Sequence, residues 1–161
     1  MLAAASNSGV NPRHPFTFPA NMRQVICINS TDGFGNPSEL NPPAAGDRTF
    51  SIIGEGIRAA WPTRLGVDET KVASGTSVAT PIAAGIAALV LEYARQFGNK
   101  AWMVENPKRL NHCDEMRKVF QYMAQPHNNY DCLVPARIFD ERGEQKHIRV
   151  SSRISDILDS L

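Results

Sequence analysis

The sequence has no excess of charge of either sign. Its 161 residues include 17 Lys and Arg against 16 Asp and Glu, which gives a net charge of +1. Proteins that bind nucleic acids or anionic membranes do so through dense positive charge. Aromatic residues make up only 7% of the chain and do not alternate with basic ones. We therefore expect no nucleic-acid partner and no membrane partner.

Cysteine is scarce as well. The chain contains Cys27, Cys113 and Cys132, an odd number with no closely spaced pair. This pattern fits neither a disulfide framework nor a zinc cluster, and no cluster of carboxylates suggests a calcium site. We predict reduced, mostly buried thiols and no metal site.

Long hydrophobic runs are also missing. The apolar run from Val78 to Leu91 contains Thr80 and Pro81 and is too short to span a bilayer comfortably. The N-terminal stretch "MLAAASNSGV" lacks a basic flank and is too short for a secretory signal. We expect a soluble, intracellular chain that is long enough for one domain with a hydrophobic core.

The first hundred residues contain strand and helix patterns. The stretch "QVICIN", residues 24–29, is rich in β-branched residues and precedes a loop of turn residues, which predicts a strand. Residues 2–6 and 56–61 are shorter strand candidates. A helix begins near Ser77 and stays apolar on nearly every side up to Glu92, which is typical of a helix buried in the middle of a protein. Together these patterns predict an α/β fold.

The rest of the chain is more polar, and its patterns indicate surface helices. Gly98 and Asn99 are expected to stop the apolar helix, and Asn111 is expected to cap a further helix with Asp114 in its first turn. Residues 140–147 are interpreted as a solvated charged loop. Two apolar stripes at helical spacing predict core-facing sides: Met116, Val119, Phe120 and Met123, then Ile154, Ile157, Leu158 and Leu161.

Ser77 stands where the apolar helix begins, inside "GTSVATP" (residues 75–81). A serine hydroxyl is a poor nucleophile until a base takes its proton, and its attack creates an oxyanion that needs donors. The first turn of a helix offers unpaired N–H groups, and Gly75 lets a substrate backbone approach. These features suit a nucleophile, although the residues alone favour the plainer interpretation. The alternative is that Ser77 or Thr76 is merely the N-cap of a buried helix.

"GTSVATP" resembles the serine motif of the subtilisin family, Gly-Thr-Ser-x-Ala-x-Pro, at every defined position. The stretch that follows, "IAAGIAALVLEYA", is similar to that family's buried central helix. The resemblance implies that Ser77 is the nucleophile of a serine endopeptidase, which cleaves polypeptide substrates through an acyl-enzyme. It implies no metal and no organic cofactor.

A second match lies upstream, in "LAAASNSG" (residues 2–9). By resemblance, Asn7 donates to the oxyanion together with the backbone N–H of Ser77, and the alternative is a turn asparagine. The resemblance also makes Ala4, Ser6 and Gly75 substrate-binding residues, because residues 3–6 would line the primary specificity pocket. Relatives usually have glycine where this chain has Ser6, and the larger side chain is expected to narrow that pocket.

A third, looser match covers "FPANMRQVICINSTDGFG", in which Phe18 replaces a tyrosine and Phe18–Pro19 is a candidate cis peptide. Residues 54–56 read Gly-Glu-Gly where relatives have Ala-Pro-Gly. The resemblance extends over residues 1–125, which we interpret as a partial peptidase domain, and residues 126–161 form an extension of unknown role. The implied fold is the C-terminal half of a subtilisin-like parallel sheet with a buried central helix.

The family's aspartate and histidine motifs, which precede the asparagine segment, have no counterpart in this chain. All four histidines follow Asn7, and His14 lies in "NPRHPF", a loop bracketed by prolines. In subtilisin itself, on which the value was measured, loss of the histidine alone lowers turnover about 10⁶-fold. The chain is therefore expected to be inactive alone.

Three interpretations follow. The first is a protease half whose N-terminal partner half is missing, so that the apolar stretch of residues 2–6 would lie at an exposed sheet edge. The second is a catalytically dead module that binds peptides or another protein. The third is an unrelated α/β domain in which "GTSVATP" occurs by chance.

Overall fold

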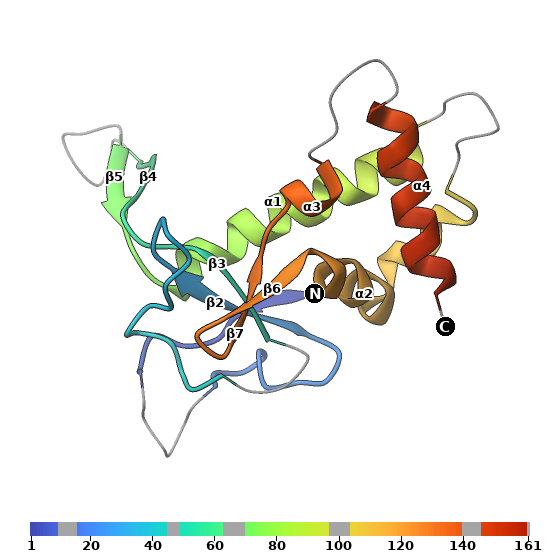
Figure 1. The fold of residues 1–161 in the computed structure, drawn as a ribbon. Coiled ribbons are helices and arrows are strands. Elements are labelled where there is room, and N and C mark those ends of the chain that lie inside the picture. The colour runs from blue at the N-terminus through green and yellow to red at the C-terminus, as the bar shows by residue number, and fades with distance from the viewer. Residues whose placement is uncertain (10–15, 45–48, 63–69, 97–103, 140–145, 161) are drawn as a thin grey trace.

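The computed structural model describes residues 1–9, 16–44, 49–62, 70–96, 104–139 and 146–160 (Figure 1). His14, Gly98, Asn99 and Leu161, which the sequence singled out, lie outside these ranges. The strands are β1 (Leu2–Ala4), β2 (Ile26–Thr31), β3 (Thr49–Ile53), β4 (Ile57–Ala60), β5 (Thr70–Ala73), β6 (Ala124–His127) and β7 (Tyr130–Leu133). The helices are α1 (Thr76–Arg95), the 3₁₀ helix η3 (Pro107–Asn111), α2 (Cys113–Met123), α3 (Ala136–Phe139) and α4 (Lys146–Asp159).

The described strands form a five-stranded sheet in the order β1-β2-β3-β7-β6. Neighbouring strands from β1 to β7 are parallel, and β6 and β7 form an antiparallel hairpin. All six residues of β2 are buried, as expected for a strand near the middle of a sheet that is covered on both faces. This mostly parallel sheet with its helices confirms the predicted α/β class.

A separate hairpin, β4–β5, projects away from the sheet (Figure 1). The predicted strand at residues 24–29 corresponds to β2, which lies two residues later, and the one at residues 56–61 corresponds to β4, which is one residue shorter at each end. The peptide bond between Phe18 and Pro19 is cis, as the resemblance implied. All three cysteines are free thiols, of which Cys27 is buried and the other two are half-buried.

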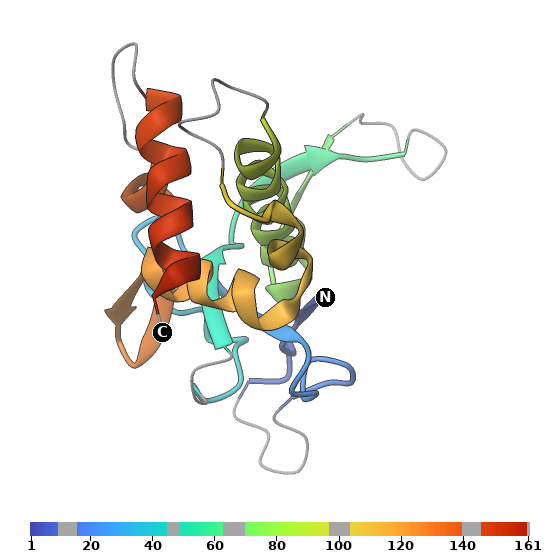
Figure 2. The same cartoon turned by 90° about the vertical axis from the view of Figure 1, so that its right-hand side faces the viewer.

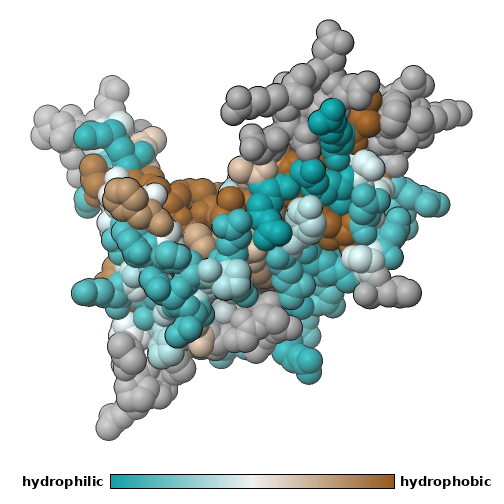
Figure 3. Space-filling model, viewed as in Figure 1, coloured by the Kyte–Doolittle hydropathy of each residue, from teal (hydrophilic) through white to brown (hydrophobic). Residues whose placement is uncertain are grey.

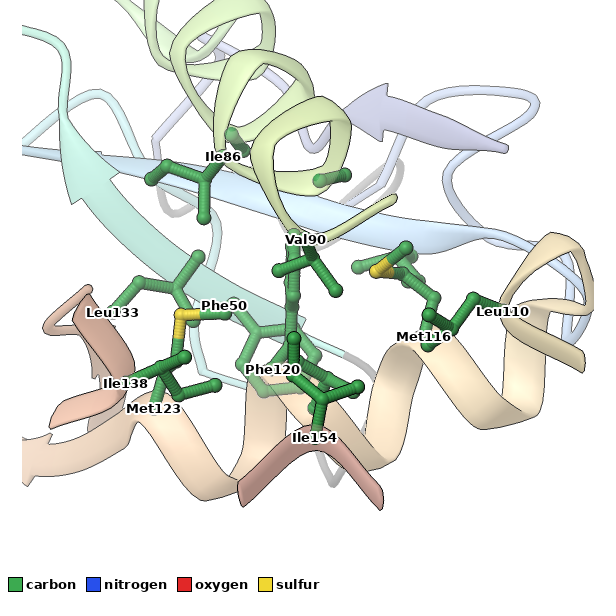
Figure 4. Close-up of a cluster of buried hydrophobic side chains, with 14 of the residues drawn as sticks. Phe50, Ile86, Val90, Leu110, Met116, Phe120, Met123, Leu133, Ile138 and Ile154 are labelled. Atoms are coloured by element: carbon green, nitrogen blue, oxygen red, sulfur yellow. The ribbon is translucent and has the colours of Figure 1, made fainter. Parts of the chain in front are cut away.

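The main hydrophobic core lies between the sheet and the helices (Figure 4). The ring of Phe50 on β3 meets the ring of Phe120 on α2 edge-on, with centroids 5.6 Å apart. Val90 of α1 and Ile154 of α4 are buried in the same cluster. The helices α1, α2 and α4 stand close together in Figure 2. The core therefore draws on residues from both sides of position 125.

Both predicted stripes of the C-terminal part lie in this core. Every residue of the first stripe, on α2, is buried, and so are the three described residues of the second stripe, on α4. The predicted cap of α2 is wrong, however. Asn111 ends η3, α2 begins at Cys113, and the cap position belongs to His112. The side-chain oxygen of Asn111 instead accepts a hydrogen bond from Arg95 Nη2 at 3.0 Å, at the end of α1.

The expectation that α1 is buried on every side is also wrong. Its sheet-facing side is buried, but an opposite side is exposed: Ser77, Pro81, Ala84, Gly85, Ala88, Leu89 and Glu92. Among the described elements, α1 contacts β1, β2 and β3, and also η3 and α4. Figure 3 shows hydrophobic surface at the bottom of a hollow between the β4–β5 hairpin and the C-terminal helices, where α1 runs. By length and composition alone α1 would also pass as a membrane span, a test that core helices pass too.

Candidate active site

The first turn of α1 begins directly after Gly75, which occupies the cap position. Gly75 is buried and has φ 130° and ψ 171°, a conformation that side-chain-bearing residues rarely adopt. No side chain caps the helix. The alternative in which Ser77 or Thr76 is the N-cap is therefore wrong: Thr76 is the first helical residue, and Ser77 is the second and is exposed.

Asn7 lies against this helix start, although 69 positions separate it from Thr76. Its side-chain oxygen accepts a hydrogen bond from the backbone N–H of Thr76 at 2.9 Å and another from the Thr76 hydroxyl at 3.0 Å. A carboxamide held through its oxygen turns its NH₂ group to the other side. That NH₂ group lies close to Gly75, because a Cβ on Gly75 would stand 2.8 Å from Asn7 Nδ2. The amide nitrogen is thus held beside the residues that lead into Ser77.

The segment before Asn7 is fixed by hydrogen bonds on several sides. The Ala5 N–H donates to the Ile28 carbonyl of β2 at 2.9 Å, and the Thr17 hydroxyl can donate to the carbonyls of Ala4 and Ala5. Ser6 is buried, and its hydroxyl accepts a hydrogen bond from the Ser8 N–H at 3.1 Å. This hydrogen bond fixes the Ser6 oxygen within the turn and leaves its O–H able to donate.

Gly54 joins the sheet to the start of α1. A Cβ at this position would stand 2.8 Å from the Cβ atoms of both Ser30 on β2 and Ala79 on α1. Its carbonyl accepts a hydrogen bond from the Gly75 N–H at 2.8 Å. The departure from Ala-Pro-Gly at residues 54–56 thus places glycine where strand and helix come closest. The signal in the sequence was a glycine directly after a strand pattern.

The structure therefore brings Ser6, Asn7, Gly75 and Ser77 together, with Ala4 at the end of β1, two residues before Ser6. The sequence did not single out Thr76 as a residue of this site. It is buried, and its hydroxyl reaches both the Ser6 carbonyl, at 3.2 Å, and the Asn7 side chain. The resemblance had drawn attention to the serine beside it, and a threonine alone gives no such signal.

Among the described residues, no acid–base pair accompanies Ser77 on the elements that form the site. His112 caps α2, and His127 of β6 contacts the Asn36 side chain at 3.3 Å. Asp32 accepts hydrogen bonds from the side chain of Asn36 and from the backbone N–H groups of Asn36 and Phe34, and these bonds lower its pKa. Asp32 therefore orders its own loop.

A family model described as the subtilase family matches residues 1–118. The chain belongs to the subtilase family. No curated protein matches the sequence. The family's fold explains why two segments so far apart in the sequence, at Asn7 and Ser77, meet at one end of the sheet.

Solved structures extend this result. The chain is similar to a mutant of the protease domain of PatA, with 27% identity over 84% of this chain and a TM-score of 0.64. It is also similar to the self-cleaved protease domain of PatA, with 26% identity over 98% of this chain and a TM-score of 0.60. The prenylagaramide maturation protease PagA shares the fold, with 23% identity over 99% of this chain and a TM-score of 0.63.

The chain spans about half the length of these structures: 46% of the first, 50% of the second and 50% of the third. Because 98% and 99% of this chain align with two of them, residues after position 125 also have counterparts in these protease structures. The chain thus corresponds to part of a subtilisin-like domain.

Proposed function

We propose that this chain supplies the nucleophile and the oxyanion-binding groups of a serine endopeptidase. The Ser77 hydroxyl attacks the carbonyl carbon of a peptide bond, and its proton passes to a general base. The carbonyl oxygen becomes an oxyanion that accepts hydrogen bonds from Asn7 Nδ2 and from the backbone N–H of Ser77. Release of the amine leaves an acyl-enzyme, which water then hydrolyses.

One observation carries this proposal: the 2.9 Å hydrogen bond from the Thr76 N–H to the Asn7 side-chain oxygen. A turn asparagine would need a partner only within its own turn. Here the side-chain oxygen reaches across to the residue adjacent to Ser77, and the amide nitrogen would stand 2.8 Å from a Cβ at Gly75. Donors held in place before the reaction stabilise a developing charge without a cost of reorganisation.

The substrate in this proposal is a polypeptide whose backbone runs past Gly75, where the absence of a side chain permits close approach. Ala4 and Ser6 would then face the residue that precedes the cleaved bond. Because relatives usually have glycine where this chain has Ser6, Ser6 would act on specificity by narrowing the pocket.

A second candidate is a catalytically dead module that binds peptides or another protein at the same cleft. The observation in its favour is that nothing in this sequence resembles the family's aspartate and histidine motifs. Such a module would bind peptides saturably and would leave Ser77 unreactive.

Fluorophosphonate labelling of the 161-residue chain separates the two. A serine protease that has lost its triad base still reacts about 10³–10⁴-fold faster than the reaction in water, a value measured on subtilisin itself. We therefore expect slow labelling at Ser77, located by peptide mass spectrometry, at least about 10³-fold faster than at Ser152, an exposed serine on α4. Equal rates at the two serines would contradict the nucleophile assignment.

A further inference from the structure

A cleft lies where the ends of β2, β3 and β7 meet one side of α1. Its volume is about 410 Å³, within the range of pockets that bind ligands. The loop after β2 contributes Asp32, Gly33 and Gly35, and β7 contributes the thiol of Cys132. We call it the Cys132 cleft. Most of its other lining residues are apolar: Ile52, Ile53, Ile82, Ile86, Leu133 and Pro135.

The charges around the Cys132 cleft favour an apolar occupant. Cys132 is half-buried, and burial raises the pKa of its thiol, which is therefore neutral at pH 7. Among the described residues that line the cleft, Asp32 alone is charged. Hydrogen bonds from the Asn36 side chain and from N–H groups of the same loop lower the pKa of Asp32 and keep its carboxylate ionised. An acidic side chain would be repelled, whereas an apolar one would find apolar walls.

Two exposed apolar side chains stand at this cleft. Phe34 lies between the two lining glycines, and 89% of its surface is exposed. Ile53, in the wall, has 36% of its surface exposed. Apolar walls with an adjacent aromatic side chain are typical of a ligand site. A side chain bound in the cleft would remove Ile53 from water and give Phe34 a neighbour.

Hydrogen bonds join the wall of the Cys132 cleft to the start of α1. Gly54 directly follows Ile53, and its carbonyl accepts a hydrogen bond from the Gly75 N–H at 2.8 Å. The N–H of Gly54 donates to the carbonyl of Thr31, another lining residue, at 2.9 Å. The cleft is therefore fixed relative to Gly75, past which the substrate backbone runs in the proposed function.

The order of the strands indicates which part of a substrate would reach the cleft. In the proposed function, the residue before the cleaved bond faces Ala4 and Ser6, beside β1. The order β1-β2-β3-β7 places the cleft on the other side of β2, so the part after the cleaved bond runs toward it. From Ser77 to Ile82, a lining residue, α1 rises about 7.5 Å. An extended peptide covers that rise in two or three residues, at about 3.3 Å each.

We propose that the Cys132 cleft binds a large apolar side chain of the substrate, two or three residues after the cleaved bond. The inference rests on the proposed function for the direction of the peptide. It defines the substrate class as polypeptides with a residue such as leucine at that position. Burial of a leucine side chain is worth at least a tenfold change in affinity. Ile53 and Phe34 are the residues that would set this preference.

The test uses the Ser77→Cys variant of the 161-residue chain, so that maleimide reports on position 77 and on Cys132 in one sample, whatever the reactivity of Ser77. Two ten-residue alanine peptides with terminal lysines differ only at their seventh residue, which is leucine or aspartate. We expect the leucine peptide to slow modification at both positions with one midpoint, at about 1 mM or below. The aspartate peptide should need at least tenfold more. Cys113, on α2 and outside the cleft, should keep its rate.

Three further variants locate the bound side chain. Ile53→Asp should raise the midpoint of the leucine peptide at least tenfold. The matched control is Met22→Asp, because Met22 is 40% exposed and lies before β2, outside the cleft, and it should leave the midpoint unchanged. Phe34→Ala removes a side chain that is exposed in the free protein, so it should leave the fold intact and raise the midpoint about threefold or more.

Each outcome has a separate meaning. Slowed modification at position 77 alone would show that the peptide does not reach the cleft. Slowed modification of Cys132 alone would show that the cleft takes an isolated apolar group. Either result would overturn the proposal, and so would no effect at about 1 mM or equal effects of Ile53→Asp and Met22→Asp. Fluorophosphonate labelling of the parent chain tests the proposed function separately. If Ser77 stays unlabelled while the peptide slows modification at both positions, the nucleophile assignment fails and the apolar subsite stands.

Discussion

Both sides of α1 contain alanines, but the two sides have opposite surroundings. Ala79 and Ala83 are fully buried, whereas Ala84 and Ala88, each five positions further along the helix, are exposed. The difference lies in what packs on the helix, because alanine is equally at home on either side. The burial of α1 residues is therefore set by their position on the helix and not by their residue type.

The largest expected effect comes from introducing an aspartate at each of two adjacent positions of α1, in separate variants. Val90→Asp places an unpaired carboxylate in the core and should cost about 4 kcal/mol of unfolding free energy or more, enough to unfold a marginally stable chain. Leu89→Asp, on the exposed side, should change the unfolding free energy by less than about 0.5 kcal/mol. Urea denaturation followed by circular dichroism measures both. Similar losses of unfolding free energy in the two variants would show that Leu89 is covered in solution.

The sequence predicted the elements whose pattern is local. The β-branched run at residues 24–29 and the α2 stripe lie where they were expected, because a buried strand and an amphipathic helix each leave a period in the sequence. The cis bond at Pro19 and the meeting of Asn7 with the start of α1 followed from the family resemblance, since no local pattern contains them.

The sequence could not predict which side of α1 faces the sheet. Its apolar residues surround the helix, so periodicity distinguishes no face. The predicted cap of α2 was wrong for a related reason. The Asn111 side chain bonds to Arg95, and a contact between two elements cannot be read from a local stretch of sequence. The β6–β7 hairpin was missed too, although Asn128 and Asn129, both with positive φ, marked its turn.

The next prediction concerns Asn7, whose side chain bonds to the first residue of α1. Asn7→Ala removes the amide donor beside Ser77 and should slow fluorophosphonate labelling of Ser77 about 10²–10³-fold, the range measured for the donor in subtilisin itself. The two hydrogen bonds that Asn7 accepts from Thr76 are also lost, and we expect a change of about 1 kcal/mol in unfolding free energy. Labelling that falls only in proportion to the fraction unfolded would contradict a donor role.

Gly75, at the cap of α1, and Gly85, within the helix, allow a further comparison. Gly75→Ala introduces a Cβ 2.8 Å from Asn7 Nδ2 at a φ of 130°, and should cost about 1–3 kcal/mol of unfolding free energy and displace the donor. Gly85→Ala is the matched control, because Gly85 is helical and exposed, with nothing within 4 Å of its new Cβ. This change should stabilise the chain by about 1 kcal/mol. Thermal unfolding measures both changes, and equal losses would exclude strain at Gly75 as the cause.

The smallest expected effect concerns thiol reactivity at an exposed position of α1 and at a half-buried position of β7. A cysteine introduced as Leu89→Cys would be exposed on α1. Cys132 of β7 is half-buried, and burial raises its pKa. Because the thiolate is the reactive form, the raised pKa lowers the thiolate fraction of Cys132 at every pH below it. Maleimide labelling at position 89 should therefore level off near the ordinary thiol pKa of about 8.5, while labelling of Cys132 continues to rise at higher pH. Rates measured from pH 6 to 10 by peptide mass spectrometry resolve the two profiles. If the two rates rise with pH in the same way, the pKa of Cys132 is not raised, and any difference in absolute rate comes from exposure alone.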